Sequence, residues 1–462
     1  MSVTLLPATE QITLLRRRAI TPLELADAHI AQILRLNPQL NALVDFEPER
    51  VREQARRVPP GPLSGLPVTI KSSISVAGMR CEIGSTLNRG SIPERNAVAV
   101  ERLIDAGAVI LGTSNCPEFL MAYETENLLH GSTRNPWNLE YSAGGSSGGE
   151  AAAIAAGMSA GGLGSDSGGS VREPAHFTGI CALKPTAGRV PAAGHLPPCQ
   201  GPFSFLGAIG PMARTVGDLA LLLAMAGGRD LGDPNSVPAV YRPVTREEAR
   251  ETVVGMFEDD GLSPVTQETR AAVQQAADSL RKQGFRVRPF RPQALEAARK
   301  LWWTFFVQCG ALLYASTIRG HQQELSPTFR DFLDLARAEA PLTADSLLEA
   351  WVASDRIRAE LLAEMQAFPI LLCPVCSIPA FRPFERSWTI DGVAVSYFDA
   401  MRYAQWFNLL GGPAAVVPVS RSASGLPIGV QIAGRPYEDE LVLAVAAAIE
   451  RDFGYQPPPM AR

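Results

Sequence analysis

The sequence predicts a fold of the α/β class, because helical and strand-like segments alternate along the chain. A first strand–helix–strand series is expected over residues 66–71, 98–106 and 108–112. A second series is expected over residues 253–257, 265–282 and 285–288. Helices that follow strands at this spacing are typical of wound α/β units. Apolar residues make up 46% of the 462 residues, which is enough for a large core.

The N-terminal part begins with a helix that carries a clear start signal. Thr21 and Glu24 form the pattern of a capping box, and Pro22 stands at the first helical position. Apolar side chains then fall on one face, and Pro38 is expected to stop the helix. The elements expected next are a strand, a charged helix and a Pro/Gly-rich loop, over residues 43–46, 47–57 and 58–67.

The C-terminal half adds further elements after a long loop over residues 190–205, whose length suggests a role near a site entrance. Aromatic residues within 301–315 favour a buried core helix over a substrate pocket. Cys373 and Cys376 form a C-x-x-C pair after an apolar strand, which favours structural thiols over a zinc or redox site. The other expected elements are helices from residue 215 and over 341–364, strands over 414–419 and 428–433, and a closing helix over 437–451.

Composition narrows the classes of function. A net charge of −5 gives no support for binding to nucleic acid or to an anionic membrane. The seven cysteines are odd in number and scattered, which favours a reducing compartment. No signal-peptide layout and no uninterrupted apolar run of about 18 residues is present. We therefore expect a cytoplasmic protein without a membrane anchor.

Two glycine-serine segments, residues 144–149 and 164–170, enclose an alanine-rich run that favours a buried helix over a flexible linker. Glycine allows the backbone to approach a ligand closely, and a serine hydroxyl can donate, accept or attack. The two segments therefore predict one site built from two loops. Matches to the α/β-hydrolase elbow, the chymotrypsin nucleophile and phosphate-binding loops lack the context that those motifs need.

Such a serine needs a base, and the best candidate is a lysine. Only four lysines occur, and Lys71 ends the apolar run over residues 66–71. Burial at the end of a strand lowers the pKa of an ammonium group, so that it can act as a neutral base. None of the five histidines has an equally good claim, and we regard them as structural.

Longer motifs in the same order along the chain resemble the amidase signature family, whose members cleave amides with a Ser-cisSer-Lys triad. The match is closest in appearance to the fatty-acid amide hydrolase branch. Segments that carry it are residues 65–71, 112–118, 144–150, 164–175, 183–186 and 425–434.

The resemblance implies a role for each matching residue. Ser170 corresponds to the nucleophile, Ser146 to the serine after the cis peptide, and Lys71 to the base. The amides of Ser167, Gly168, Gly169 and Ser170 correspond to the oxyanion hole, and Ser147, Asp166 and Arg172 support the site. The family requires no metal and no cofactor.

The resemblance also implies a single α/β/α unit over residues 1–462, with a mixed, mostly parallel twisted sheet covered by helices. Residues 1–60 are expected to form a helical region that packs on this unit, and residues 190–400 a variable region that shapes the substrate pocket. Members are often dimeric, which leaves a homodimer open.

The expected function is hydrolysis of the C–N bond of a small-molecule amide with an apolar acyl or aryl group, through an acyl-enzyme. The alternatives are the glutaminase (A) subunit of a glutamyl-tRNA amidotransferase and a non-catalytic binding protein on the same scaffold.

Overall fold

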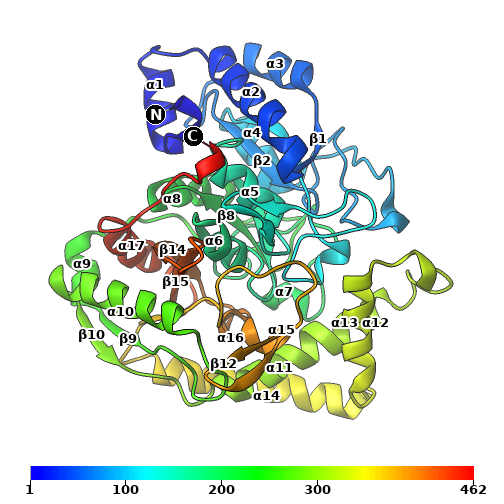
Figure 1. Cartoon of the computed structure of the whole chain (residues 1–462), viewed down its shortest axis with the longest axis vertical. Helices are drawn as coiled ribbons and strands as arrows, with labels where there is room; N and C mark the ends of the chain where they lie inside the picture. Colours follow the sequence, from blue (N-terminus) through cyan, green and yellow to red (C-terminus); the bar gives the residue numbers. More distant parts are fainter. Residues whose placement is uncertain (1, 462) are drawn as a thin grey trace.

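The computed structural model describes residues 2–461. An 11-stranded sheet runs through the middle of the molecule (Figure 1). In spatial order its strands are β1 (Leu43–Phe46), β3 (Val109–Ser114), β2 (Pro67–Lys71), β6 (Gly161–Asp166), β8 (Ala208–Ala213), β7 (Cys181–Lys184), β14 (Ala414–Arg421), β15 (Pro427–Gly434), β11 (Ile370–Pro374), β9 (Val253–Met256) and β10 (Arg286–Pro289). The small two-stranded sheets are β4 (Arg134–Asn135) with β5 (Asn138–Ser142), and β12 (Ser387–Ile390) with β13 (Val393–Ser396).

The large sheet is mixed, as predicted. Parallel pairs form two blocks, β3-β2-β6 and β11-β9-β10. The strands between these blocks, from β6 through β8, β7, β14 and β15 to β11, pair antiparallel, and β1 pairs antiparallel with β3. The expectation of a mostly parallel sheet therefore holds for the two blocks and not for the central strands.

Helices cover both faces of the sheet, and the alternation of side chains along β14 shows how. Val416 packs in one cluster with residues of α5 (Gly148–Ala155) and α6 (Arg172–Thr178). Its neighbours Ala415 and Val417 pack in another cluster with α8 (Val216–Ala226) and α17 (Asp439–Glu450). Because successive strand residues point to opposite faces, these helix pairs lie on opposite sides of the sheet.

The remaining helices surround this core. Both predicted strand–helix–strand series are confirmed, as β2-α4-β3 and β9-α10-β10. The helices are α1 (Ala8–Arg16), α2 (Pro22–Leu40), α3 (Pro48–Arg56), α4 (Val98–Asp105), α7 (Phe203–Leu206), α9 (Arg246–Glu251), α10 (Gln267–Lys282), α11 (Leu295–Trp303), α12 (Cys309–Tyr314), α13 (Pro327–Ala338), α14 (Ala344–Glu364), α15 (Tyr397–Ala400) and α16 (Arg402–Leu410). Short 3₁₀ turns cover Val3–Leu5, Thr86–Asn88, Glu118–Leu120, Gln322–Glu324 and Pro459–Ala461.

Helix α2 starts as predicted and ends later than predicted. Thr21 and Glu24 form the expected capping box. The helix passes through Pro38 and ends at Leu40, where Asn41 takes a left-handed conformation with φ of 51°. Proline lacks the backbone N–H and favours a helix end. Here the Asn37 side chain accepts hydrogen bonds from the amides of Ala42 and Leu43, so the last turn ends in a defined cap.

The predicted aromatic helix over residues 301–315 is interrupted. Helix α11 passes into a π-helical turn, Thr304–Gln308, before α12. Trp302 and Phe305 are fully buried in a large aromatic cluster, whereas Leu312 and Leu313 are exposed. The core interpretation is therefore confirmed for the first half of this segment only.

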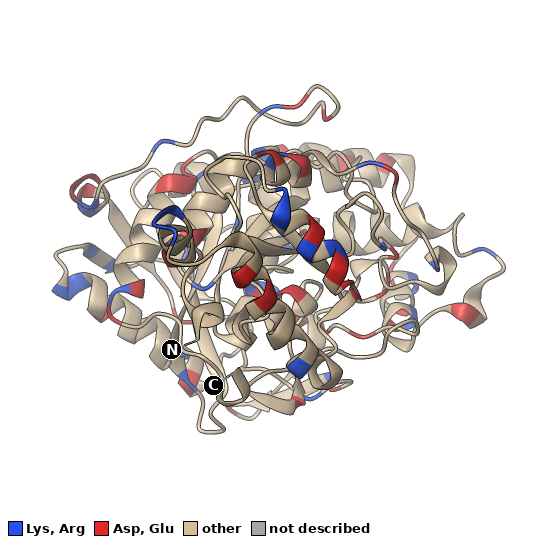
Figure 2. Ribbon diagram, turned by 90° about the horizontal axis from the view of Figure 1, so that it is seen from above, with Lys and Arg blue, Asp and Glu red and all other residues tan. Residues whose placement is uncertain are grey.

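Charge is distributed over the outer elements, and Figure 2 shows acidic and basic residues interspersed along the surface helices. Within residues 2–461, no helix is both long enough and apolar enough to cross a bilayer. The two ends of the chain lie close together in Figures 1 and 2. Near the C-terminal end, Gln32 Nε2 of α2 donates a hydrogen bond to the Ala461 carbonyl.

Candidate active site

Two strands and two helices meet at one edge of the parallel block and bring the two glycine-serine segments together. Strand β2 ends at Lys71, and the parallel strand β6 ends at Asp166. Because the carboxyl ends of parallel strands share an edge, these two ends are neighbours. Helix α5 begins just after Ser146 and Ser147, and α6 begins two residues after Ser170.

Lys71 is fully buried, as its place at the end of an apolar strand predicted. Its Nζ lies 2.6 Å from Ser146 Oγ and 3.2 Å from Ser165 Oγ. Burial lowers the pKa of the ammonium from 10.5 to about 8, although Cys116, Asp166 and Glu150 nearby offset part of this shift. A pKa of about 8 lets a substantial share of Lys71 be neutral in mildly alkaline solution.

Ser146 and Ser147 follow each other and have different surroundings. The peptide bond between Gly145 and Ser146 is cis, as the resemblance implied. Ser146 faces Lys71 and lines a cavity. Ser147 donates its amide to the Ser170 carbonyl at 3.1 Å and exchanges hydrogen bonds of 3.3 Å with the Ser165 backbone. Ser147 thus ties the two loops together, and its hydroxyl bonds the Ser165 backbone instead of Lys71.

Ser146 and Ser170 line the same cavity of about 230 Å³, which we call the serine cavity. Ser170 is 8% exposed, the largest exposure among the three triad candidates. Among residues 2–461, no hydrogen bond joins Ser146 Oγ to Ser170 Oγ, and Ser170 Oγ is directed to the cavity without a partner. In unliganded enzymes catalytic hydrogen bonds are often longer than in the substrate complex.

The loop 167–170 carries the predicted oxyanion donors. Within residues 2–461, the amides of Ser167, Gly168 and Ser170 have no protein acceptor. The amide of Gly169 donates to Asp166 Oδ1 at 2.7 Å. The prediction that Gly169 offers its amide to substrate is therefore not supported, because Asp166 already takes this donor.

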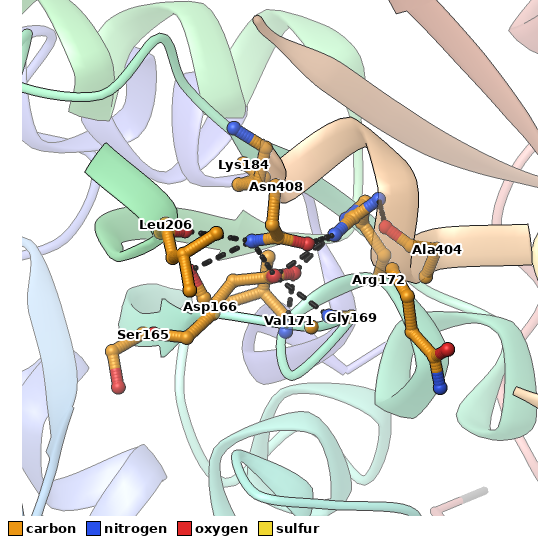
Figure 3. Close-up of polar contacts among 12 residues, drawn as sticks. Ser165, Asp166, Gly169, Val171, Arg172, Lys184, Leu206, Ala404 and Asn408 are labelled. Carbon is orange, nitrogen blue, oxygen red and sulfur yellow. Dashed lines mark hydrogen bonds and ion pairs between the residues drawn. The ribbon is translucent and has the colours of Figure 1, made fainter. Parts of the chain in front are cut away.

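Asp166 and Arg172 form a buried ion pair that fixes the start of α6 (Figure 3). Arg172 donates to Asp166 from Nε at 3.0 Å and from Nη2 at 2.9 Å. Burial raises the pKa of the Asp166 carboxyl, but Arg172 and a hydrogen bond from Asn408 lower it more, so that this pKa lies well below its usual value. The pair therefore stays ionised and holds the loop from both of its ends.

Most of the serine cavity is apolar. Its lining includes Phe119, Phe203, Phe306, Leu313 and Tyr314. Among the described lining residues none is Asp, Glu, Lys or Arg. Residues 197–200 also line the cavity, which agrees with the predicted role of the long loop over residues 190–205 near the site.

Two further adjacent aromatic residues, Trp406 and Phe407, do not line the serine cavity. Both are buried within α16, where they pack into the aromatic cluster.

Neither His176 nor His195 is suited to act as a base beside the serines. His176 is fully buried between the backbones of Gly429 and Ile378, at about 3.0 Å from each carbonyl. His195 lines the cavity, but burial lowers its pKa to about 4. Within the described part of the chain, no cluster of His, Cys, Asp and Glu has the arrangement of a metal site. Cys373 and Cys376 are buried free thiols.

Several residues of the site were missed by the sequence reasoning. Ser165 is the second partner of Lys71, and the signal for it was its place next to Asp166 at the end of a strand. Asn408 and Gln431 each accept a hydrogen bond of 2.6 Å from Arg172. They come from distant segments, so no local pattern could reveal Asn408, although Gln431 lies in the last matching motif.

Comparison with known proteins decides the family. A family model described as Amidase matches residues 24–443. The chain belongs to the Amidase family. This amidase is a hydrolase of carbon–nitrogen bonds in amides, as the resemblance implied. The matched region contains every candidate site residue from Lys71 to Arg172.

The relatives of this amidase fall into more than one functional class. It is 32% identical to an indoleacetamide hydrolase of Bradyrhizobium diazoefficiens, over 97% of this chain and 86% of that protein. It is 35% identical to the (A) subunit of the glutamyl-tRNA(Gln) amidotransferase of a Roseiflexus species, over 95% of this chain and 94% of that protein.

Solved structures share the fold. A 6-aminohexanoate cyclic dimer hydrolase with its substrate gives a TM-score of 0.88 at 26% identity, with 99% of this chain and 100% of that chain covered. A fatty acid amide hydrolase gives 0.87 at 24% identity, with 97% of this chain and 85% of that chain covered.

Proposed function

We propose that this amidase hydrolyses small amides with an apolar acyl or aryl group, through the triad of Ser170, Ser146 and Lys71. The contact that carries the proposal is the 2.6 Å approach of Lys71 Nζ to Ser146 Oγ, in a cavity that Ser170 shares. Ser170 is the nucleophile, Ser146 the relay and Lys71 the base.

The first half-reaction forms an ester. Neutral Lys71 takes the proton of Ser146 as Ser146 takes the proton of Ser170, and Ser170 Oγ attacks the amide carbon. The carbonyl oxygen becomes an alkoxide, which the free amides of the loop 167–170 stabilise by donating hydrogen bonds. Collapse of this intermediate breaks the C–N bond, and the proton held by Lys71 returns through Ser146 to the leaving nitrogen.

The second half-reaction regenerates the enzyme. Water attacks the ester carbon while the relay Ser146–Lys71 takes its proton. A second alkoxide forms at the same place, and its collapse breaks the bond to Ser170 Oγ. The carboxylic acid leaves, and Ser170 recovers its proton through the relay.

The size and lining of the serine cavity support a small apolar substrate. Its volume of about 230 Å³ is below the roughly 300–1,000 Å³ that ligand pockets usually have. The lining combines aromatic and aliphatic side chains with the serines. The indoleacetamide hydrolase relative is named for an amide whose acyl group carries an indole ring, which agrees with this class.

The alternative function is that of a glutaminase in an amidotransferase complex, which the 35% identical amidotransferase relative raises. A glutamine site needs charged partners for the α-amino and α-carboxylate groups. The described lining of the serine cavity contains no charged side chain, which favours the apolar amide. The chain then acts without a partner protein.

Two further expectations stay part of this proposal. Residues 1–462 act as a single amidase domain, with the helical region 1–60 packed on it and the region 190–400 shaping the pocket. The cavity-lining residues from Pro197 to Thr317 support the last point. A cytoplasmic location is supported by the seven free cysteines. A homodimer remains open.

The test is a panel of amides given to the purified chain alone. We expect kcat/KM for hexanamide and for an acyl anilide to exceed the value for acetamide, and glutamine to be the poorest substrate. A fluorophosphonate should block turnover and leave its mass on the peptide that contains Ser170. Faster turnover of glutamine, or turnover only with an added amidotransferase partner, would favour the alternative function.

A further inference from the structure

The carbonyl groups of the loop 166–169 are all held by donors. The Asn408 side chain donates to the Asp166 carbonyl at 3.3 Å, and the Glu173 amide donates to the Gly169 carbonyl at 2.7 Å. The two carbonyls between them are held by aromatic residues. Trp302 Nε1 donates to the Ser167 carbonyl at 2.8 Å, and the Tyr123 hydroxyl donates to the Gly168 carbonyl at 2.9 Å.

These contacts set the direction of the amides as well. In a trans peptide unit the C=O of one residue and the N–H of the next point in opposite directions. The bond from Trp302 therefore turns the Gly168 N–H away from the indole, and the bond from Tyr123 turns the Gly169 N–H toward Asp166. The loop needs such restraint because glycine has little conformational preference, and Gly169 has φ of 122°.

Both aromatic residues are themselves fixed. Gln405 Nε2 donates to the Tyr123 hydroxyl at 3.1 Å, so that this hydroxyl directs its proton to the Gly168 carbonyl. The Tyr123 amide donates to the Tyr397 hydroxyl at 2.7 Å. Trp302 is fully buried and stacks on Phe306, with ring centroids 4.6 Å apart. A Cβ at Gly168 would lie 2.6 Å from the Trp302 ring, so the loop and the indole are in direct contact.

We propose that Tyr123 and Trp302 are positioning residues for amide hydrolysis, which hold the peptide planes of the loop 167–170 so that its free amides face the serine cavity. The inference rests on the proposed function of this cavity. Without the hydroxyl of Tyr123, only the bond from the Gly169 amide to Asp166 holds the Gly168–Gly169 peptide, so the free amides on either side of it, those of Gly168 and Ser170, lose their fixed direction. An amide that is not held in direction stabilises the developing alkoxide less well than a fixed one.

The test removes one oxygen atom. Tyr123→Phe keeps the ring and loses only the donor to the Gly168 carbonyl. We expect kcat for hexanoyl p-nitroanilide to fall about 10- to 100-fold, less than the roughly 10²–10³-fold known for a lost oxyanion donor because the amides themselves remain, while KM stays within about twofold. The inhibition constant of a hexyl trifluoromethyl ketone, which forms an alkoxide on Ser170, should rise by the same factor as kcat falls.

Tyr403→Phe is the matched control. Tyr403 is also buried and donates its hydroxyl to a backbone carbonyl, that of Ser263 at 2.6 Å, away from the loop 167–170. Kinetic constants of this variant should match those of the original chain. If Tyr123→Phe fails to fold, Gln405→Met provides the test, because it removes the group that orients the Tyr123 hydroxyl and should lower kcat several-fold.

The outcomes separate the inference from the proposed function. No hydrolysis and no fluorophosphonate label on Ser170 in the original chain would refute the proposed function. An active, labelled original chain, with Tyr123→Phe at unchanged kcat and unchanged ketone affinity, would refute the positioning role alone. Equal losses in Tyr403→Phe and Tyr123→Phe would also refute it, because a general loss of stability would then explain both.

Discussion

The site has two sides that are built in different ways. On the reactive side, Lys71, Ser146 and the Asp166–Arg172 pair are buried polar groups with directional partners at 2.6–3.2 Å. On the substrate side, Phe306, Leu313 and their neighbours contribute shape and apolar surface to the serine cavity. Directional contacts tolerate little displacement, whereas apolar packing tolerates substitution. Changes on the reactive side should therefore alter rate, and changes on the substrate side should alter preference.

The largest effect should follow from loss of the nucleophile. Ser170→Ala removes the atom that forms the ester, so kcat/KM should fall at least about 10⁴-fold. The fluorophosphonate should no longer label the peptide that contains residue 170. Steady-state kinetics and a mass spectrum of the labelled digest measure both. Labelling that survives in this variant would place the nucleophile elsewhere.

Loss of the base should lower activity nearly as much, because the three residues of the triad work as a unit. Lys71→Ala should remove nearly all activity at neutral pH. In the original chain kcat/KM should rise with pH through one limb near the pKa of about 8 and level off above it, because only the neutral amine can accept a proton.

A pH–rate profile between pH 6 and 10 measures this limb. Protonation of Lys71 below its pKa removes the base, so activity falls as the pH falls. His130→Ala serves as the control and should keep the limb. Its disappearance in that variant would contradict the role of lysine.

The two serines before α5 should differ from each other. Ser146→Ala removes the proton relay and should lower kcat by orders of magnitude in a folded protein. Ser147→Ala removes hydrogen bonds of 3.3 Å between the loops and should cost less, through looser packing. The two variants are compared by kcat and by thermal melting. A far larger loss at Ser147 would exchange the two roles.

The reactive side could be predicted from sequence because its residues lie in short segments. A buried strand that ends in lysine, two glycine-serine loops and a helix between them determine where Lys71, Ser146 and Ser170 meet. It was harder to predict which amides of the loop 167–170 are free to bind the alkoxide, because the pairing of Gly169 with Asp166 depends on the turn after β6. The extent of α2 past Pro38 was also missed, since the Asn37 cap that completes the turn has no strong signal.

The substrate side could be predicted only in part. Phe119, Phe203 and Tyr314 line one cavity although they are far apart in sequence. Their meeting depends on how the aromatic cluster packs, and many apolar sequences satisfy the same packing. Trp406 and Phe407 are aromatic residues as well, but they are buried in the core and do not line the cavity. The antiparallel centre of the sheet was likewise not visible, because strand order follows from long-range pairing.

Lengthening the acyl chain of the substrate should raise kcat/KM moderately and in steps. Each further methylene buried in the serine cavity adds about 0.8 kcal/mol, or about fourfold in kcat/KM. The increase should stop once the cavity of about 230 Å³ is full, so that long-chain acyl amides gain nothing over medium ones. A series of linear amides from acetamide upward measures the slope and its end. A slope that continues to fatty-acyl length would contradict the small cavity.

The smallest expected effect is a change in acyl preference, which we test by comparing substitutions of two adjacent leucines of α12. Leu313 is 54% exposed and lines the serine cavity, whereas Leu312 is 61% exposed and lies outside it. Leu313→Ala should reduce the preference for hexanamide over acetamide a few-fold, because it removes apolar surface that contacts the longer acyl chain. Leu312→Ala removes the same atoms at a similar exposure and should leave this ratio unchanged. The ratio of the two kcat/KM values cancels differences in the amount of active protein. Equal ratios in both variants would show that the mouth of the cavity does not contact the acyl chain, and would move acyl selection to the buried rings of Phe119 and Phe306.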